Sequence, residues 1–353
     1  MRWAALFQLS VMLIAGAMVL YAETGGRRFF QPVGRARATD RAVAYQQRDH
    51  TDEIVFLGSS QCGSMIVPDR VEEGLAERGI EAEACVLWLA GAHAATRYTA
   101  MRDLILRHGK PRLVVIQVAP RTFDADGEDI EQYVAGVASL GDALRLVGRD
   151  VLGRWRLAGV PLARGASACL QHVLMSGSYS VADVAARSGS RWHYSPDDPA
   201  HAAARNAREV APGTEEYYQK RLAVYRAEFQ SFRTHDMPAW FEATLDIAQA
   251  ESVPVVLLFD SYSDRGCADL GGGHVDAALR LIRPMARERG VPLWIAADID
   301  PALADASSYE DLLNHATPEA ACRMSRLLGS GPVADVLLGT AGGGPHPMET
   351  EVE

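Results

Sequence analysis

The chain has 353 residues, a mass of 38.2 kDa and a formal charge of −10 at pH 7, from 35 basic and 45 acidic side chains. Hydrophobic residues make up 48% and charged residues 23%, which excludes a disordered, collagen-like or coiled-coil chain and indicates an ordinary globular core. The acidic balance gives no global support to a nucleic-acid-binding surface, so nucleic acid is not an expected partner.

An apolar run opens the chain. Residues 4–22 form a stretch of 19 residues without a charge. At about 1.5 Å per residue this run nearly matches the ~30 Å hydrocarbon core of a bilayer. A cleaved signal peptide is the alternative, but its apolar region is usually about 7–15 residues long and ends in a small-x-small site, whereas Leu20, Tyr21 and Ala22 precede Glu23 here. We predict a membrane anchor over residues 1–28 and a basic linker over 29–52.

From Glu53 onward, short apolar strands alternate with amphipathic helices. Strands are predicted at 53–58, 84–91, 112–119, 253–260 and 291–297, and helices at 67–78, 95–108, 214–230, 238–251, 275–289 and 318–328. Helical crossovers of this length join parallel strands. We therefore expect an α/β domain over 53–330, a three-layer α/β/α (flavodoxin-like) arrangement with a parallel sheet. A mainly helical insertion is expected at about 124–237, after the third strand, and a flexible tail over 331–353.

Polar and small residues follow the predicted strands at their carboxyl ends, where parallel α/β sheets bind ligands. Gly58, Ser59 and Ser60 end the first strand, a pattern that also suits a helix cap. Near the C-terminus, Asp311 precedes His315 by four positions, just before the last helix. A carboxylate so placed can hold an imidazole in one tautomer and support its cation, although such a pair is also a common structural hydrogen bond.

These blocks, in this order, resemble the SGNH (GDSL-like) hydrolase superfamily over about residues 53–328. Gly58-Ser59-Ser60 stands where that family has its nucleophile block, Gly91 where it has its glycine block, and Asp311 with His315 where it has its Asp-x-x-His block. The Gly-Ser-Ser opening, a Pro-Arg pair in the third block and the N-terminal anchor look most like the membrane-anchored branch. That branch includes the D-alanine transfer proteins of teichoic acids (DltD-like) and the alginate and peptidoglycan O-acetylation proteins.

The resemblance implies a serine esterase or O-acyltransferase without a cofactor or metal. Ser60 is the expected nucleophile, His315 the base and Asp311 the residue that orients the base. Four further residues are expected to form the oxyanion hole or bind substrate: Gly91, Arg121, Ser59 and His93. Cys62, two positions after Ser60, is a weaker candidate nucleophile, because buried cysteines are usually inert.

Two features depart from the family pattern. Pro120-Arg121 stands in place of the third-block Asn, an oxyanion donor, so Arg121 is the expected substitute. The Asp-to-His spacing is four positions instead of three, which leaves open whether Asp311 reaches His315, whether Asp305 takes its role, or whether no acid does.

The resemblance also implies an acyl donor and a carbohydrate acceptor, a membrane-bound acyltransferase as a candidate partner, and an extracytoplasmic (periplasmic) catalytic domain on a single-pass anchor in the cytoplasmic membrane. The arginines that follow the apolar run favour the opposite orientation by the positive-inside rule. Two alternatives stay open. One is a catalytically inactive scaffold or carbohydrate-binding component of an envelope-polymer assembly, and the other is a cytoplasm-facing tethered binding module.

Overall fold

The computed structural model describes residues 53–89, 91–123, 213–228, 237–260, 262–271 and 273–339, with isolated residues at 13, 14, 16, 17, 45, 142 and 145. The chain divides into two units, and nearly all described residues belong to the unit made of His50–Asp124, Trp192–Phe232 and Met237–Glu353. Most of the predicted anchor, of the linker and of the insertion lies outside the described residues. Among the residues that are described, no helix has both the length and the apolar character needed to cross a bilayer.

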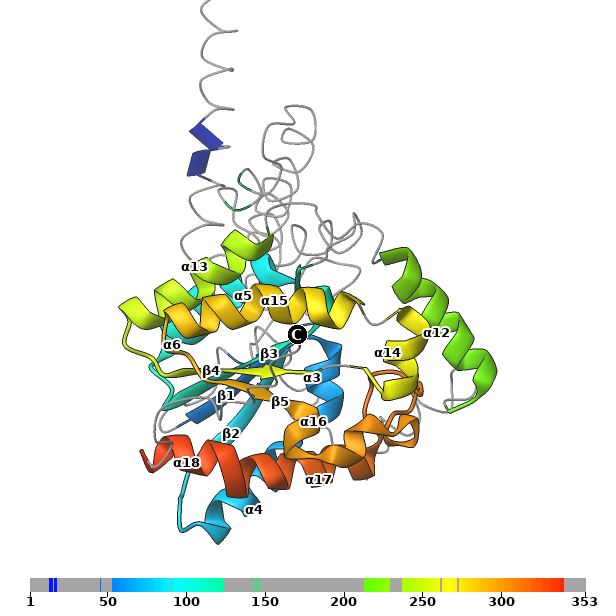
Figure 1. The fold of residues 1–353 in the computed structure, drawn as a ribbon. Helices are drawn as coiled ribbons and strands as arrows, with labels where there is room; N and C mark the ends of the chain where they lie inside the picture. The colour runs from blue at the N-terminus through cyan, green and yellow to red at the C-terminus, as the bar shows by residue number, and fades with distance from the viewer. Residues whose placement is uncertain are drawn as a thin grey trace, which may run out of the picture. The chain divides into compact units, whose positions relative to one another are not determined.

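The centre of the described unit is a parallel sheet of five strands in the order β2-β1-β3-β4-β5 (Figure 1). The strands are β1 (Glu53–Gly58), β2 (Glu83–Trp88), β3 (Leu113–Val118), β4 (Val255–Phe259) and β5 (Leu293–Ile295). Every residue of β1, β3 and β4 is buried, as expected of apolar, β-branched strands that are covered on both faces. The predicted α/β class with a parallel sheet is therefore confirmed.

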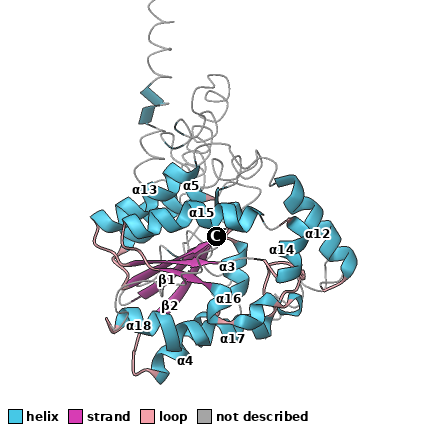
Figure 2. Ribbon diagram, in the orientation of Figure 1, coloured by secondary structure: helices cyan, strands magenta, loops and turns pink. Residues whose placement is uncertain are grey.

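Helices cover both faces of the sheet (Figure 2). The longer ones are α4 (Pro68–Glu77), α5 (Ala94–Ala100), α12 (Glu215–Glu228), α13 (Met237–Ala250), α14 (Asp264–Leu270), α15 (Gly273–Glu288) and α17 (Pro318–Leu328). The shorter ones are α3 (Ser60–Met65), α6 (Leu106–His108), α16 (Ala296–Ile299) and α18 (Ala334–Leu337), with π-helical turns at Met101–Ile105 and Gly329–Val333 and 3-10 turns at Pro120–Phe123, Pro301–Ala304 and Ala306–Ser308. In Figure 1, α4, α17 and α18 lie on one side of the sheet, and α5, α13 and α15 lie on the other.

The face toward α4 and α17 belongs to a cluster of buried residues, in which Phe56 of β1 packs with Leu75 of α4 and Met324 of α17. Helix α17 begins and ends where the sequence predicts. Thr317 caps it, with the side-chain oxygen accepting from the Ala320 amide at 3.3 Å, and Pro318 occupies the first turn, where no amide donor is needed.

Several predicted boundaries differ from the structure by one to three residues, for example that of the second strand, which ends at Trp88 instead of Gly91. The last strand is only three residues long, because the chain turns into α16 at Ala296, within the predicted strand 291–297. The ordered domain also extends past the predicted end at residue 330, since Val333 and Ala334 are fully buried in the core cluster and α18 continues to Leu337.

The strand order places a switch point between β1 and β3. The chain passes from β1 to β2 on one side and then returns across β1 to β3, so the connections that follow β1 and β3 leave in opposite directions. Open α/β sheets bind ligands beyond the carboxyl ends of the strands at such a point. Ser59 follows β1 directly, and the turn Pro120–Phe123 follows β3.

Candidate active site

The turn after β1 presents Ser60. Ser59 is the N-cap of α3, with an extended backbone and a side chain that accepts from the Gln61 amide at 3.4 Å. Ser60 is therefore the first helical residue, and its amide has no acceptor within the helix. The amide and hydroxyl of Ser59 both donate to Oε1 of Gln117, at 3.2 and 3.4 Å. We predicted that Ser59 binds substrate or the oxyanion. In the structure, its amide and hydroxyl form hydrogen bonds that stabilise the turn.

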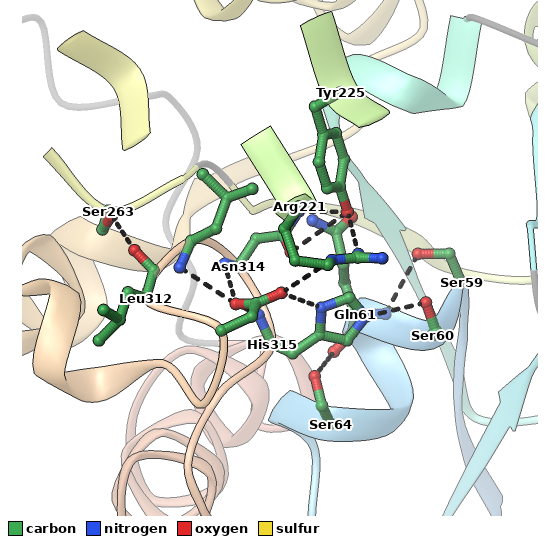
Figure 3. Close-up of polar contacts among 12 residues, drawn as sticks. Ser59, Ser60, Gln61, Ser64, Arg221, Tyr225, Ser263, Leu312, Asn314 and His315 are labelled. Atoms are coloured by element: carbon green, nitrogen blue, oxygen red, sulfur yellow. Dashed lines mark hydrogen bonds and ion pairs between the residues drawn. The ribbon is translucent and has the colours of Figure 1, made fainter. Parts of the chain in front are cut away.

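Ser60 and His315 meet across 255 positions of the chain. The Ser60 Oγ lies 3.2 Å from the His315 Nε2, and the His315 Nδ1 lies 2.7 Å from the Asp311 Oδ2 (Figure 3). An ionised carboxylate can only accept hydrogen bonds, so the proton of the neutral ring belongs on Nδ1 and the lone pair of Nε2 faces the serine hydroxyl. The structure therefore brings together the three residues predicted as catalytic, and their arrangement favours the tautomer that a general base requires.

Asp311 reaches the ring because its loop coils around the carboxylate. Its Oδ1 accepts from the amides of Leu313, Asn314 and His315 at 3.0, 2.8 and 3.0 Å, and this leaves Oδ2 for the ring. Leu312 takes up the sharp bend with a φ of 56°, a left-handed conformation that bulky residues rarely adopt. The four-position spacing therefore does not prevent the contact.

The charge state of Asp311 follows from these partners. The side chain is 1% exposed, and this burial raises the pKa of the carboxyl. The hydrogen bonds and charge of His315 outweigh burial, and the guanidinium of Arg221 adds to their effect, so the pKa of Asp311 lies well below its usual range. Asp311 is thus ionised throughout the neutral range and can support an imidazolium.

Two buried polar side chains, Gln117 and Arg97, support the Ser59-Ser60 turn. Gln117 interrupts the otherwise apolar β3, and its Oε1 accepts from Arg97 Nη2 at 3.2 Å as well as from Ser59. Arg97 also donates through Nε to the Gln117 carbonyl oxygen at 3.1 Å. Neither residue was predicted from the sequence, although a single glutamine within a buried strand was an available signal.

Asp260 directly follows β4 and lies near Gln117. It is 1% exposed, and neither carboxyl oxygen has a hydrogen-bond partner among the described residues. Burial raises its pKa well above the ordinary value, Gln117 offsets this only in part, and the negative charge of Asp311 raises it further. The protonated form of Asp260 is therefore favoured by its surroundings, and the sequence predicted this residue only as the end of a strand.

Helix α12 adds two residues that the sequence analysis also missed. Arg221 Nε lies 3.5 Å from the Asp311 Oδ2, and Arg221 Nη2 donates to the Tyr225 hydroxyl at 3.0 Å. The Asn314 Nδ2 donates to the same hydroxyl at 2.8 Å. Nothing in the local sequence marks these residues, because α12 lies outside the regular alternation of strands and helices.

The other predicted binding residues fall in different surroundings. Gly91 adopts a φ of 63° in the turn after β2, where a side chain would be strained. His93 is 1% exposed, caps α5 through its backbone and has its Nε2 3.4 Å from the Thr96 hydroxyl. The Arg121 Cζ lies 5.3 Å from the centre of the Tyr225 ring. No contact of these residues with Ser60 is shown, so their roles stay predictions.

The two competing candidates are poorly placed for catalysis. Cys62 is fully buried, and burial raises the pKa of its thiol to about 12, which disfavours the thiolate. Asp305 is exposed and accepts from the Ser307 amide at 2.8 Å as the cap of a 3-10 turn. The acid that contacts His315 is Asp311.

Within the described ranges, no group of three or more His, Cys, Asp or Glu side chains could hold a metal ion. The sequence matches no protein-family model, and no curated protein matches it significantly. A solved structure that matches is a Bacteroides fragilis NCTC 9343 protein described as a "putative acylhydrolase", at 12% identity and a TM-score of 0.34, over 87% of this chain and 96% of that one. A likeness this loose carries no argument about function, which rests instead on the site geometry.

Proposed function

We propose that the chain is a serine esterase or O-acyltransferase that acts on O-acyl groups of an envelope or exported polysaccharide through an acyl-Ser60 intermediate. The observation that carries the serine chemistry is the contact of Ser60 with His315 at 3.2 Å, backed by Asp311 at 2.7 Å. The polysaccharide substrate and the location outside the cytoplasmic membrane are supported by the resemblance to the membrane-anchored SGNH branch.

Acylation begins when the Ser60 oxygen attacks the carbonyl carbon of an ester. The hydroxyl proton passes to His315 Nε2, and the imidazolium that forms is stabilised by Asp311. The amide of Ser60, which has no acceptor within α3, points to a role as an oxyanion donor, and one such donor is commonly worth about 10²–10³ in rate. His315 then returns the proton to the departing alkoxide, which leaves an acyl ester on Ser60.

Deacylation reverses these roles. Water or a sugar hydroxyl attacks the acyl-Ser60 carbonyl and gives its proton to His315, which passes it back to the Ser60 oxygen as the acyl bond breaks. Water as the acceptor makes the protein an esterase, and a sugar hydroxyl makes it a transferase. The proton transfers are the same for both acceptors. Esterase and transferase activity therefore differ only in the molecule that attacks the acyl-Ser60 carbonyl.

The proposed anchor is supported by the apolar run at 4–22. Two of its described residues, Leu13 and Ile14, are helical and expose 65% and 59% of their surface, an exposure that suits contact with lipid. A reporter enzyme fused at the C-terminus, active only outside the cytoplasm, tests the orientation. Activity only inside the cell would contradict envelope chemistry and favour the cytoplasm-facing module.

The serine chemistry is tested with a fluorophosphonate probe, which forms a covalent bond with an activated serine. We expect wild-type protein to be labelled and Ser60→Ala to be unlabelled. Ser64→Ala is the matched control, because Ser64 lies in the same short helix and its hydroxyl donates to the Gln61 carbonyl oxygen at 2.9 Å. Folded wild-type protein that does not label would favour the inactive scaffold. Acyl transfer to an added oligosaccharide, followed by mass spectrometry, separates transferase from esterase.

A further inference from the structure

Arg221, a cationic side chain on α12, lies beside Asp311, the acid that contacts His315. Arg221 Nε lies 3.5 Å from the Asp311 Oδ2, and Figure 3 draws the Arg221 side chain next to His315 and Tyr225. The Asp311 side chain is 1% exposed and the Arg221 side chain 25%. This pair therefore differs from solvated surface ion pairs, which contribute little to stability because water screens them.

The guanidinium is fixed from its other side by Tyr225, one helical turn further along α12. Arg221 Nη2 donates to the Tyr225 hydroxyl at 3.0 Å, and the Arg221 Cζ lies 5.1 Å from the ring centre. The Asn314 Nδ2 donates to that hydroxyl at 2.8 Å. Helix α12 thus contacts the catalytic loop at Asp311 and Asn314, which both precede His315.

Helix α12 is itself well anchored to this part of the molecule. The buried side chains of α12 are Tyr218, Leu222 and Tyr225. They form a separate apolar cluster with Tyr262, Leu270 and Leu313. At its start, the Gly213 amide donates to the Glu310 carbonyl oxygen, and the Arg265 guanidinium contacts both oxygens of Glu215, at 2.7 and 2.8 Å. The helix can therefore act as a fixed support for the loop.

From this geometry we infer that Arg221 is a positioning residue for the proposed reaction: it fixes the Asp311 carboxylate so that the His315 ring stays directed at Ser60. The inference rests on the proposed serine chemistry. Oδ1 of Asp311 is held by three loop amides, whereas Oδ2 faces both the ring and Arg221. A buried carboxylate needs such partners to offset the cost of desolvation, and the guanidinium supplies a charge while His315 is neutral.

The test compares the rate of Ser60 labelling by the fluorophosphonate probe in Arg221→Gln, Arg221→Lys and wild type. We expect Arg221→Gln to label about 10- to 100-fold more slowly, since a small displacement of a catalytic group costs rates of this order. Arg221→Lys should recover part of the rate because it keeps the charge. Arg226→Gln is the control on the same helix, where the exposed side chain donates to the Asp269 carbonyl oxygen, and it should label at the wild-type rate.

A double-mutant cycle separates positioning from a general structural role. In an Asp311→Asn background, Arg221→Gln should change the labelling rate less than about twofold, because the residue through which it acts has lost its charge. The low-field proton resonance of His315 Nδ1 should broaden or shift in Arg221→Gln, and thermal unfolding shows whether each variant is folded.

The outcomes are distinct for the two proposals. Absence of labelling in folded wild-type protein overturns the serine chemistry, and the His315 resonance still reports whether Arg221 positions the ring. Labelling of Arg221→Gln at the wild-type rate, or an equal loss in both backgrounds, overturns the role of Arg221 alone. Should Arg221→Gln fail to fold, the labelling rate of Arg221→Lys in the two backgrounds decides the question in the same way.

Discussion

The Asp311 carboxylate lies 2.7 Å from the Nδ1 of His315, although the two residues are four positions apart in the chain. The contact depends on a closed loop. The Glu310 amide donates to the His315 carbonyl oxygen at 2.7 Å, and the Leu312 carbonyl oxygen accepts from the Ser263 hydroxyl at 2.9 Å. These bonds fix the loop from outside, while Asp311 Oδ1 fixes it from within. The loop amides thus compensate for the extra residue between acid and base.

Replacement of Asp311 tests this assignment of the acid. Asp311→Asn cannot accept from the Nδ1 proton as a carboxylate does, and the corresponding change in a serine protease triad costs about 10⁴ in rate. We expect the Ser60 labelling rate to fall by about that factor. Asp305→Asn, at the exposed cap that was the competing candidate, should label like wild type. The reverse result would make Asp305 the functional acid.

Acid should remove a stabilising contribution of Asp311. Burial raises its pKa, but the His315 hydrogen bonds and charge, with Arg221, depress the folded-state pKa below the unfolded value of about 3.9. For a depressed carboxyl pKa the stabilisation is present above pH 3.9 and is lost as the pH falls toward the folded value. The difference in unfolding free energy between wild type and Asp311→Asn should therefore shrink between pH 5 and pH 2, as measured by urea unfolding. A difference that does not change with pH contradicts the depressed pKa.

The contribution of Asp260 to stability should depend on pH with the opposite sign. Its folded-state pKa is raised by burial, so above about pH 3.9 the unfolded chain loses a proton that the folded protein retains. Stability then falls with rising pH until the folded carboxyl titrates. Because asparagine does not titrate, Asp260→Asn should gain stability relative to wild type as the pH rises above about 4, by at most about 1.4 kcal/mol per pH unit. Asp298→Asn controls for the loss of one exposed charge, and a relative stability of Asp260→Asn that is flat over this range would refute the raised pKa.

Gly58 is required by the close approach of the chain below Ser60. A Cβ at this position would lie 2.4 Å from the Cys62 Cβ and 2.7 Å from the Gln117 Oε1. Overpacking of this kind costs about 1–3 kcal/mol, and here it also displaces the support of the turn. Gly58→Ala should lower the unfolding temperature and slow Ser60 labelling at temperatures where the variant is folded. Gly273→Ala, whose Cβ meets nothing within 4 Å, should leave both unchanged. Equal behaviour of the two variants would show that the turn has room for a side chain.

The amino-acid sequence by itself determined the alternation of buried strands and amphipathic helices, and hence the parallel sheet, because side-chain periodicity and local caps act within a few residues. Helix α17 is an example, because its start is specified locally by Thr317 as the cap and Pro318 in the first turn. The sequence blocks that contain Ser60, Asp311 and His315 also resemble those of the SGNH superfamily, and this resemblance nominated the three as catalytic residues.

Only the tertiary structure decided whether these residues meet. The 3.2 Å contact of Ser60 with His315 depends on the packing of α17 against α3, the short helix that begins at Ser60, where the Ser325 hydroxyl donates to the Met65 carbonyl oxygen. Likewise, the position of Arg221 beside Asp311 is set by the docking of α12 on a separate apolar cluster. Local patterns carry no information about such distant neighbours, because the burial that brings them together is a property of the whole fold.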